Sequence, residues 1–287
     1  MERHLSVLVP VYEQWDLVPE LLACLAAQTL PPDSFEVILS DNGSRNFVPP
    51  ATLPDNVRII TCERPGSYAA RNAAAALATG DWFAFTDADC LPEPGWLAAL
   101  SRVAESADAR TILVGGVDVR PAGTPGNAYE IYDMLKGIPQ ERYASRGYGA
   151  TANLAVSATL FRDAGGFDAT RLSGGDAEFC RRAVARGASV RFVSDARVGH
   201  PARADWDAIA TKSRRVLGGQ IAAGSPGRRA AFLLRTLGSP IIPTWRFLRA
   251  PYPLGDRLTA VGVQLRLWGV ELREAVRLLA GGKPERR

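Results

Sequence analysis

The sequence has few cysteines and histidines, the residues that build zinc sites and disulfide frameworks. Its 287 residues include 4 cysteines and 2 histidines. The cysteines lie far apart and form no Cys-x-x-Cys pair, which argues against a zinc site and against a disulfide framework. The apolar run at the N-terminus is too short for a signal peptide. We therefore expect a cytoplasmic protein with reduced thiols.

Charge of one sign is not in large excess either. Lys+Arg number 34 against 30 Asp+Glu, a formal net charge of +4, so the composition does not indicate a nucleic-acid binder and we expect no nucleic-acid partner. Hydrophobic residues make up 47% of the chain and charged residues 22%, which is ordinary for a globular protein with a substantial core. The length predicts one main domain with an appendage.

Short runs rich in valine, isoleucine and phenylalanine alternate with helical patterns in the first 110 residues. The predicted strands are residues 5–10, 35–40, 57–61 and 82–86, and the predicted helices are residues 16–28, 68–79 and 94–107. This alternation predicts an α/β fold with a Rossmann-like, mostly parallel sheet flanked by helices. In such sheets ligands bind beyond the carboxyl ends of the strands, so the loops there are the first candidates for chemistry.

Two aspartates end the fourth predicted strand, in the stretch FAFTDADCLP. One residue separates Asp87 from Asp89, so both side chains can face one ligand if the chain stays extended. Mg²⁺ and Mn²⁺ prefer oxygen ligands and often take one or two carboxylates together with phosphate oxygens of the substrate. The pair therefore predicts a metal–diphosphate site, and a polar strand end with Asp89 capping a local turn is the alternative.

Two further residues suggest nucleotide binding. Asp41 opens the sequence Asp-Asn-Gly-Ser after the second strand, where its carboxylate can accept hydrogen bonds from a nucleobase or simply form an Asx turn. Arg71 lies in a helix otherwise built of small residues. Its guanidinium could engage two phosphate oxygens, whereas a solvated surface arginine is the plain alternative.

Five segments stand in a fixed order along roughly residues 5–200: LSVLVPVYE, SDNGS, ERPGSYAARNAAAALATGDWFAFTDADCLPEPGWL, GATANLAVSATLFRDAGGFD and SGGDAEFCRRAVARG. Together they resemble an inverting glycosyltransferase of sequence family two, with the GT-A fold. The resemblance implies a nucleotide pocket lined by Pro10, Tyr12 and Glu13, a base contact from Asp41, a phosphate contact from Arg71, and ribose and metal contacts from Asp87 and Asp89.

The resemblance also implies a catalytic base in the second half of the chain. Relatives carry a Glu-Asp pair and then another acid at the start of a helix, and the Asp takes the proton of the acceptor hydroxyl. Here Gly175 replaces the Glu, so Asp176 is the expected base and Glu178 the alternative; both could instead be acids that favour the helix dipole. His200, in a loop after a predicted strand, is expected at the metal or diphosphate, with a structural histidine as the alternative.

Two expectations about local structure accompany these segments. A Gly-Gly-Phe-Asp turn is expected after the helix that begins at Ser157. The helix that Asp176 begins is expected to turn Phe179, Ala183 and Val184 inward and Arg181, Arg182 and Arg186 outward.

The implied reaction is transfer of a hexosyl group from a nucleotide sugar, by family habit a UDP-sugar, to the hydroxyl of a carbohydrate or lipid-linked acceptor. It would need Mn²⁺ or Mg²⁺, invert the anomeric configuration and serve polysaccharide or glycolipid biosynthesis. Processive relatives carry Gln-x-x-Arg-Trp where this chain has residues 211–215, TKSRR, which predicts single-residue transfer.

Two other functions stay open from the sequence. One is a sugar nucleotidyltransferase, although its glycine-rich loop after the first strand is replaced here by Pro10 and the residues up to Glu13. The other is a non-catalytic protein that binds sugar nucleotides as a scaffold, which the missing acid at Gly175 favours.

We expect a catalytic domain over residues 1–225, with a nucleotide-binding half at 1–110 and an acceptor half at 111–225, followed by a helical tail at 226–287. The tail lacks a run of eighteen uncharged apolar residues, so we expect it not to span a membrane. It mixes arginines with Phe232, Leu233, Trp245, Phe247 and Trp268, which fits an amphipathic segment lying on the inner face of the cytoplasmic membrane. Alternatively, a helix over residues 258–279 packs on the catalytic domain or on a second subunit.

Overall fold

The computed structural model describes residues 4–123, 126–171, 173–222 and 226–284. The chain divides into two compact units: the first comprises Met1–Asp118, Ile138–Thr170 and Gly175–His200, and the second comprises Val119–Gly137, Arg171–Gly174 and Pro201–Arg287. The expected division of the chain after residue 225 stays a prediction. By compactness, residues 201–222 group with the C-terminal helices.

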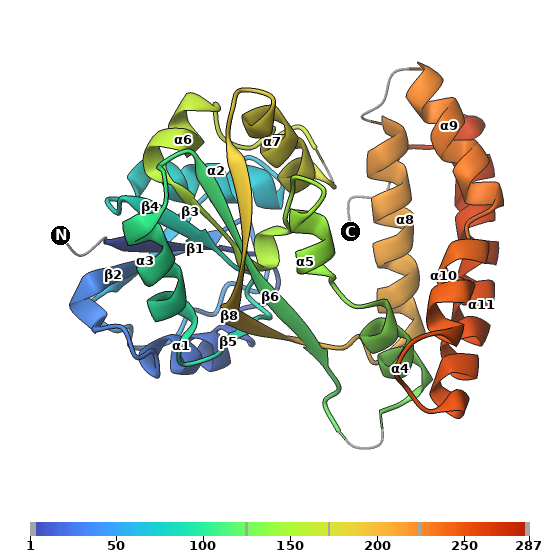
Figure 1. The fold of residues 1–287 in the computed structure, drawn as a ribbon, viewed down its shortest axis with the longest axis horizontal. Helices are drawn as coiled ribbons and strands as arrows, with labels where there is room; N and C mark the ends of the chain where they lie inside the picture. The colour runs from blue at the N-terminus through green and yellow to red at the C-terminus, as the bar shows by residue number, and fades with distance from the viewer. Residues whose placement is uncertain (1–3, 124–125, 172, 223–225, 285–287) are drawn as a thin grey trace. The chain divides into compact units, whose positions relative to one another are not determined.

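The described strands form one eight-stranded mixed sheet in the order β3-β2-β1-β4-β7-β6-β8-β5 (Figure 1). The neighbours β1 (Leu5–Val11), β2 (Phe35–Asp41), β3 (Val57–Thr61) and β4 (Trp82–Phe85) are parallel. The remaining strands are β7 (Leu154–Ser157), antiparallel to β4 and to β6 (Thr111–Arg120), and β5 (Leu91–Pro92), antiparallel to β8 (Ser189–Pro201). The predicted α/β fold, with its parallel sheet in the first half of the chain, is confirmed.

Both faces of the sheet are buried, because successive strand residues enter different cores. Val7 and Val9 of β1 pack in the core beneath α1 (Val18–Ala26) and α3 (Trp96–Ser106). Leu8 packs on the other face, beneath α2 (Ser67–Leu77), α6 (Ala158–Asp163) and α7 (Gly175–Val184). Side chains alternate across a strand, so a strand covered on both sides reads as an unbroken apolar run.

The predicted Gly-Gly-Phe-Asp turn after α6 is attached to α2. Gly165 and Gly166 have φ angles of +80° and +66°, a conformation that residues with a Cβ rarely adopt. A Cβ on Gly166 would also lie 2.9 Å from Oδ1 of Asn72. Asn72 donates to the carbonyl of Phe167 at 2.7 Å and accepts from its N–H at 2.9 Å. The glycines thus permit a close approach that fixes the acceptor-side segment to α2.

One part of the helix prediction was wrong. In α7, Phe179 and Ala183 are fully buried as expected, but Val184 is 38% exposed and Cys180 is buried in its place. Cys180 is a small hydrophobic residue that suits an inner position. Arg182, expected on the outside, lies half-buried beside the Gly-Gly turn. The inner face of α7 is therefore rotated relative to the apolar pattern of the sequence.

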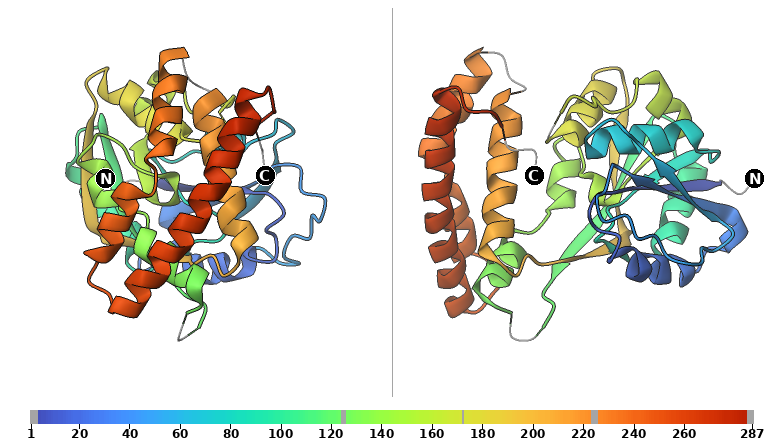
Figure 2. Two further views of the ribbon diagram at one scale, coloured as in Figure 1. Left: turned by 90° about the vertical axis from the view of Figure 1, so that its right-hand side faces the viewer. Right: turned by 180° about the vertical axis from the view of Figure 1, so that it is seen from behind.

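The second unit is helical, as predicted for the C-terminal segment. Its helices are α4 (Ala128–Lys136), α8 (Trp206–Ala222), α9 (Pro226–Leu237), α10 (Ile241–Leu248) and α11 (Leu254–Leu279) (Figure 2). Its core contains Tyr132, Ile209, Phe247, Ala260, Val263 and Leu267. Within the residues that the structure describes, no helix combines the length and the apolarity needed to cross a bilayer. The side chains of Phe232 and Leu233 lie outside the described part.

The remaining short elements all belong to the first unit. They are α5 (Gln140–Ala144) and two turns of 3-10 helix, η1 (Pro32–Ser34) and η2 (Thr151–Asn153).

Candidate active site

The loop after β2 is held by the carboxylate of Asp41. Its Oδ1 accepts from the indole Nε1 of Trp15 at 2.8 Å, and its Oδ2 accepts from the N–H groups of Gly43 at 3.0 Å and Ser44 at 3.2 Å. Burial alone would raise the pKa of Asp41, but the hydrogen bonds from Ser44 and Trp15 outweigh it and lower the pKa. Asp41 is thus an ionised residue that shapes this loop, and the expected contact with a base stays a prediction.

The loop after β1 is joined to the same segment through Glu13. Its carboxylate accepts from the N–H groups of Arg45 at 2.8 Å and Asn46 at 3.2 Å, and these two bonds lower its pKa. Glu13 has a φ of +53°, which is uncommon for a residue with a side chain and costs conformational energy. Pro10 and Tyr12 lie half-buried in this strand end and loop.

Asn42, a neighbour of Asp41, joins the third loop to the other two. Its side-chain nitrogen donates to the carbonyls of Cys62 at 3.1 Å and Arg64 at 2.8 Å, and its oxygen accepts from the N–H of Gly66 at 2.6 Å. The loops after β1, β2 and β3 therefore form one bonded surface at the carboxyl ends of parallel strands, which is the expected place for a nucleotide.

Arg71 is a buried cation at the same edge of the sheet. It is 3% exposed, its Nη2 donates to Oδ1 of Asp87, and its guanidinium lies 5.7 Å from the centre of the Tyr68 ring. Its Nε is buried without a hydrogen-bond partner among the described residues. A buried guanidinium with an unsatisfied donor fits an anion that approaches from outside the protein. Arg71 is therefore not a solvated surface arginine.

Asp87 and Asp89 lie together and are both accessible. Together with Cys90, they offer ligand atoms that all lie within 4.8 Å of one another. The side chain of His200 is 6% exposed, and its Nε2 lies 3.7 Å from Oδ2 of Asp89. His200 was expected in a loop, but it lies near the end of strand β8.

The chemistry of this group fits a hard divalent cation. Burial and the charges of Asp87 and Asp89 raise the pKa of Cys90 well above its usual value, so Cys90 remains a thiol and a poor ligand. The two carboxylates are left as the principal donors, and carboxylates favour Mg²⁺ or Mn²⁺. The residues present therefore fit the expected metal.

Asp176 begins α7 and lies beside Tyr68. The hydroxyl of Tyr68 donates to Oδ1 of Asp176 at 3.3 Å, and the N–H of Ala177 donates to the same oxygen at 2.8 Å. Burial raises the pKa of Asp176 against the opposing effects of the Ala177 N–H and the charge of Arg71. Burial also raises the pKa of Tyr68, so its hydroxyl keeps its proton and stays a donor.

The aromatic ring of Tyr68 lies where a side chain at position 175 would project. A Cβ built on Gly175 would lie 2.7 to 2.9 Å from three atoms of the ring, closer than two such atoms normally approach. A larger residue at 175 and a tyrosine at 68 are therefore incompatible in this packing. Sequence reasoning did not identify Tyr68, and the only signal for it was the unexpected glycine.

Glu178 is engaged in an ion pair of its own. Its two carboxylate oxygens accept from Nε of Arg182 at 2.8 Å and from Nη2 at 3.1 Å, and Arg182 also donates to the carbonyl of Gly166 at 2.7 Å. Glu178 is thus occupied by Arg182, whereas the charge of Arg71 acts to lower the pKa of Asp176.

The fold thus joins residues from distant parts of the sequence. A chain of contacts runs from Asp176 through Tyr68 and Arg71 to Asp87, and Asp89 lies two residues further along the loop after β4. The expected base and the expected phosphate and metal residues therefore belong to one site at one edge of the sheet.

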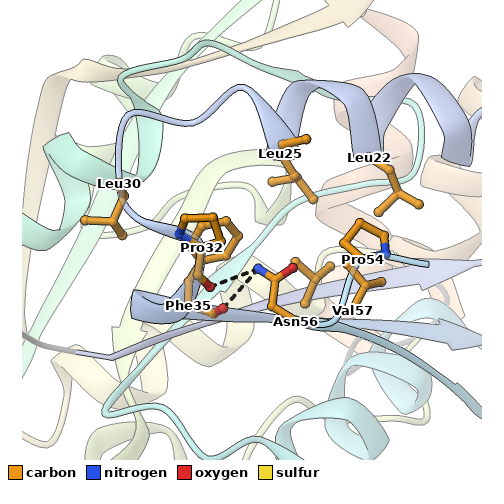
Figure 3. A pocket seen from close by; sticks show the side chains of 10 residues that line it. Leu22, Leu25, Leu30, Pro32, Phe35, Pro54, Asn56 and Val57 are labelled. Carbon is orange, nitrogen blue, oxygen red and sulfur yellow. Dashed lines mark hydrogen bonds between the residues drawn. The ribbon is translucent and has the colours of Figure 1, made fainter.

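A cavity of about 120 Å³ lies elsewhere. It is lined by Leu22 and Leu25 of α1 and by Phe35 and Val57, which begin β2 and β3, and Figure 3 shows the apolar side chains that point into it. Asn56 borders it and is satisfied by the carbonyls of residues 32 and 35. The cavity is apolar and lies at the amino ends of the strands, so it is not part of the candidate site.

The known proteins that this chain is similar to are glycosyltransferases. The sequence model of the family described as Glycosyl transferase family 2 matches residues 6–164. Among curated proteins, the glycosyltransferase AglE of Haloferax volcanii is 34% identical over 223 residues, which cover 75% of this chain and 72% of AglE. The pre-mycofactocin glycosyltransferase of Mycobacterium tuberculosis is 32% identical over 151 residues, 49% of this chain and 32% of that protein.

Two solved structures share the fold. The mannosyltransferase PcManGT of Pyrobaculum calidifontis, in complex with GDP-Man and Mn²⁺, superposes with a TM-score of 0.60 at 21% identity, covering 97% of this chain and 88% of that one. S. aureus TarS in complex with UDP-GlcNAc superposes with a TM-score of 0.53 at 19% identity, covering 92% of this chain and 72% of that one.

Proposed function

The chain belongs to glycosyltransferase family 2, and from this membership we propose that it transfers a hexosyl group from a nucleotide sugar to an acceptor hydroxyl with inversion of the anomeric carbon. The observation that carries the proposal is the chain of contacts from Asp176 through Tyr68 and Arg71 to Asp87. It joins a candidate base to a candidate diphosphate site.

The donor side is proposed to use the bonded loops and Arg71. The surface made by Glu13, Asp41 and Asn42 would receive the nucleoside, with Pro10 and Tyr12 beside it. The unsatisfied Nε of Arg71 would donate to the diphosphate, where a guanidinium can bind two oxygens. We propose a UDP-sugar as the donor.

Asp89 and Asp87 are proposed to hold a Mn²⁺ or Mg²⁺ ion, with His200 beside it. When bound, such an ion acts as a Lewis acid that offsets the negative charge of the leaving nucleoside diphosphate. Asp87 also pairs with Arg71, so one of its oxygens orients the guanidinium while the other stays available.

Asp176 is proposed as the general base. It takes the proton of the acceptor hydroxyl as the acceptor oxygen bonds to the anomeric carbon, and the bond from that carbon to the diphosphate oxygen breaks with its electron pair. One in-line displacement requires a single carboxylate base and no enzyme nucleophile. A raised pKa brings a carboxylate closer to the working pH and makes it a better proton acceptor. Tyr68 would hold the carboxylate in place.

Glu178 is the weaker candidate for this role. Its bidentate pair with Arg182 would have to break before it could accept a proton. We propose that Glu178 instead anchors Arg182 beside the Gly-Gly turn.

The acceptor is proposed to be a carbohydrate or lipid-linked hydroxyl in polysaccharide or glycolipid biosynthesis on the cytoplasmic side. We propose transfer of one residue at a time, because residues 211–215 lack the Gln-x-x-Arg-Trp sequence of processive relatives.

A scaffold that binds nucleotide sugars without turning them over is the alternative, and donor hydrolysis separates the two. We expect Mn²⁺-dependent release of nucleoside diphosphate from a UDP-sugar. Asp89→Ala should abolish this release, and Asp176→Asn should abolish it while donor binding persists. Donor binding without release by the unaltered chain would overturn the enzymatic proposal. Family membership removes the support for a nucleotidyltransferase.

A further inference from the structure

The outer side of α11 carries an exposed apolar stripe along its whole length. Leu254, Leu258, Leu265, Val276 and Leu279 are between 50% and 68% exposed. They are separated by 4, 7, 11 and 3 residues, intervals that return to the same side of an α-helix. A monomeric soluble protein rarely exposes an apolar patch of this extent without a binding role.

The opposite side of α11 packs in the core of the second unit. Ala260, Val263 and Leu267 are buried in the core of the second unit together with Tyr132 of α4 and Ile209 of α8. The two interpretations of this helix that the sequence left open are therefore compatible. One side packs within the protein, and the other side remains available for a partner.

The neighbouring helix α10 has exposed apolar residues of its own. Ile241, Ile242 and Trp245 are 70%, 66% and 57% exposed, and α10 packs beside α11 (left view of Figure 2). The guanidinium of Arg249 lies 4.1 Å from the centre of the Trp245 ring. An exposed tryptophan with a stacked arginine is typical of residues at a membrane–water interface. We name the exposed apolar residues of α10 and α11 the outer face.

The charges around the outer face are strongly one-sided. Residues 226–287 contain twelve Lys+Arg and four Asp+Glu residues. Arg266 and Arg277 each follow a stripe residue by one position, and Arg273 precedes Arg277 by four, so the three arginines border the stripe on one side. Two of the acids are turned inward: Glu274 is 4% exposed and pairs with Arg277 at 2.6 Å, and Glu271 accepts from two serine hydroxyls. Arg266 and Arg273 are thus the bordering arginines without a carboxylate of this helix beside them in an ion pair among the described contacts.

We propose that the outer face is a docking surface for an anionic lipid bilayer. An apolar stripe bordered by arginines matches the acyl–headgroup boundary of a membrane, where apolar side chains insert and basic ones meet anionic headgroups. A symmetric contact between two copies of the chain would instead bring these arginines against each other. The inference concerns binding alone and does not depend on the catalytic proposal.

Co-sedimentation of the full chain with vesicles tests the proposal. We expect binding to vesicles of equal parts phosphatidylcholine and phosphatidylglycerol, weaker binding to phosphatidylcholine alone, and release by salt. Replacing Leu258, Leu265 and Val276 with serine should lower the partition coefficient about tenfold for each residue that inserts. Replacing Val48 and Leu77, which are 72% and 51% exposed in the first unit, is the matched control and should change nothing.

A second pair of variants tests the contribution of arginine charge to vesicle binding. Arg273→Gln should lower binding to the anionic vesicles about fivefold, whereas Arg102→Gln, whose side chain is 66% exposed in the first unit, should leave it unchanged. These positions are exposed, so folding and donor hydrolysis should persist in every variant. Equal binding by the stripe variant and its control would overturn the proposal. A second result would also overturn it: no form of the chain binds vesicles, and the unaltered chain forms a concentration-dependent dimer that the stripe variant abolishes. The partner would then be a second copy of the chain.

Discussion

The contact between Tyr68 and Asp176 leads to a quantitative prediction about pH. Tyr68→Phe removes the hydroxyl that lies 3.3 Å from Oδ1 of Asp176 and keeps the ring that packs against Gly175. The variant therefore removes one hydrogen bond to the carboxylate and leaves the packing in place. Because that bond favours the ionised form, its loss should raise the pKa of Asp176 further above its ordinary value.

The size of the shift follows from the length of the bond. Hydrogen bonds to charged groups contribute about 1.5–3 kcal/mol, but 3.3 Å is long for a hydroxyl donor, so we use about 0.5–1.5 kcal/mol. At about 1.4 kcal/mol per pKa unit, this raises the pKa of Asp176 by roughly 0.4 to 1 unit. A base must be ionised to act, so the acid limb of kcat/KM should move to higher pH by the same amount. At pH values below the limb, kcat/KM should fall roughly 2.5- to 10-fold.

The assay is kcat/KM against pH for transfer to an acceptor, or to water before an acceptor is identified. Tyr143→Phe is the control: the ring of Tyr143 stacks on Tyr148, and we expect the loss of its hydroxyl to leave the limb where it is. Rates of Tyr68→Phe should approach those of the unaltered enzyme well above the limb. An unmoved limb, a limb moved to lower pH, or an equal movement in Tyr143→Phe would refute the reasoning.

Three further predictions concern the same site. Asp87→Ala should lower the free energy of unfolding by about 1–3 kcal/mol, because it leaves the buried guanidinium of Arg71 without its carboxylate. Asp89→Ala should instead abolish Mn²⁺-dependent turnover with little loss of stability. Chemical denaturation of both variants measures this difference in stability. Gly175→Ala should destabilise the fold by about 1–3 kcal/mol, since its Cβ would lie 2.7 Å from the tyrosine ring that it faces, and a denaturation midpoint equal to that of the unaltered chain would contradict the contact. Burial raises the pKa of Asp176, so the ionised carboxylate opposes folding. At pH values above this raised pKa, Asp176→Asn should therefore be more stable than the unaltered chain, and the difference should vanish as the pH falls below the ordinary pKa of aspartate. Thermal unfolding measured across pH tests this.

The fold was predictable where the burial of a segment determines its local pattern of apolar residues. The strands from β1 to β4 are covered on both faces, so each reads as an apolar run that ends in a turn, and their observed bounds differ from the predicted ones by at most one residue. Asp41 ends β2 and Asp87 lies in the loop after β4. The strand order brings the carboxyl ends of β1 and β2 together in register, with Val11 opposite Asp41.

Contacts between distant segments were not predictable in the same way. Tyr68 looked like the first residue of an alanine-rich helix, and its partner Asp176 lies 108 residues further on. Trp15, which donates to Asp41, gave no signal at all. The inner face of α7 was misjudged because Cys180 and Val184 are both apolar, and only the surrounding packing decides which of them is buried.

The central claim is that Asp87 and Asp89 bind the diphosphate of a nucleotide sugar through a divalent metal ion, opposite the base Asp176. A crystal grown with Mn²⁺ and an unreactive UDP-sugar analogue tests this most directly, with the manganese located by its anomalous scattering. We predict an anomalous peak between the carboxylates of Asp87 or Asp89 and the diphosphate, with the anomeric carbon on the side of Asp176. A bound nucleotide with no manganese at these aspartates, or with its sugar directed away from Asp176, would contradict the account.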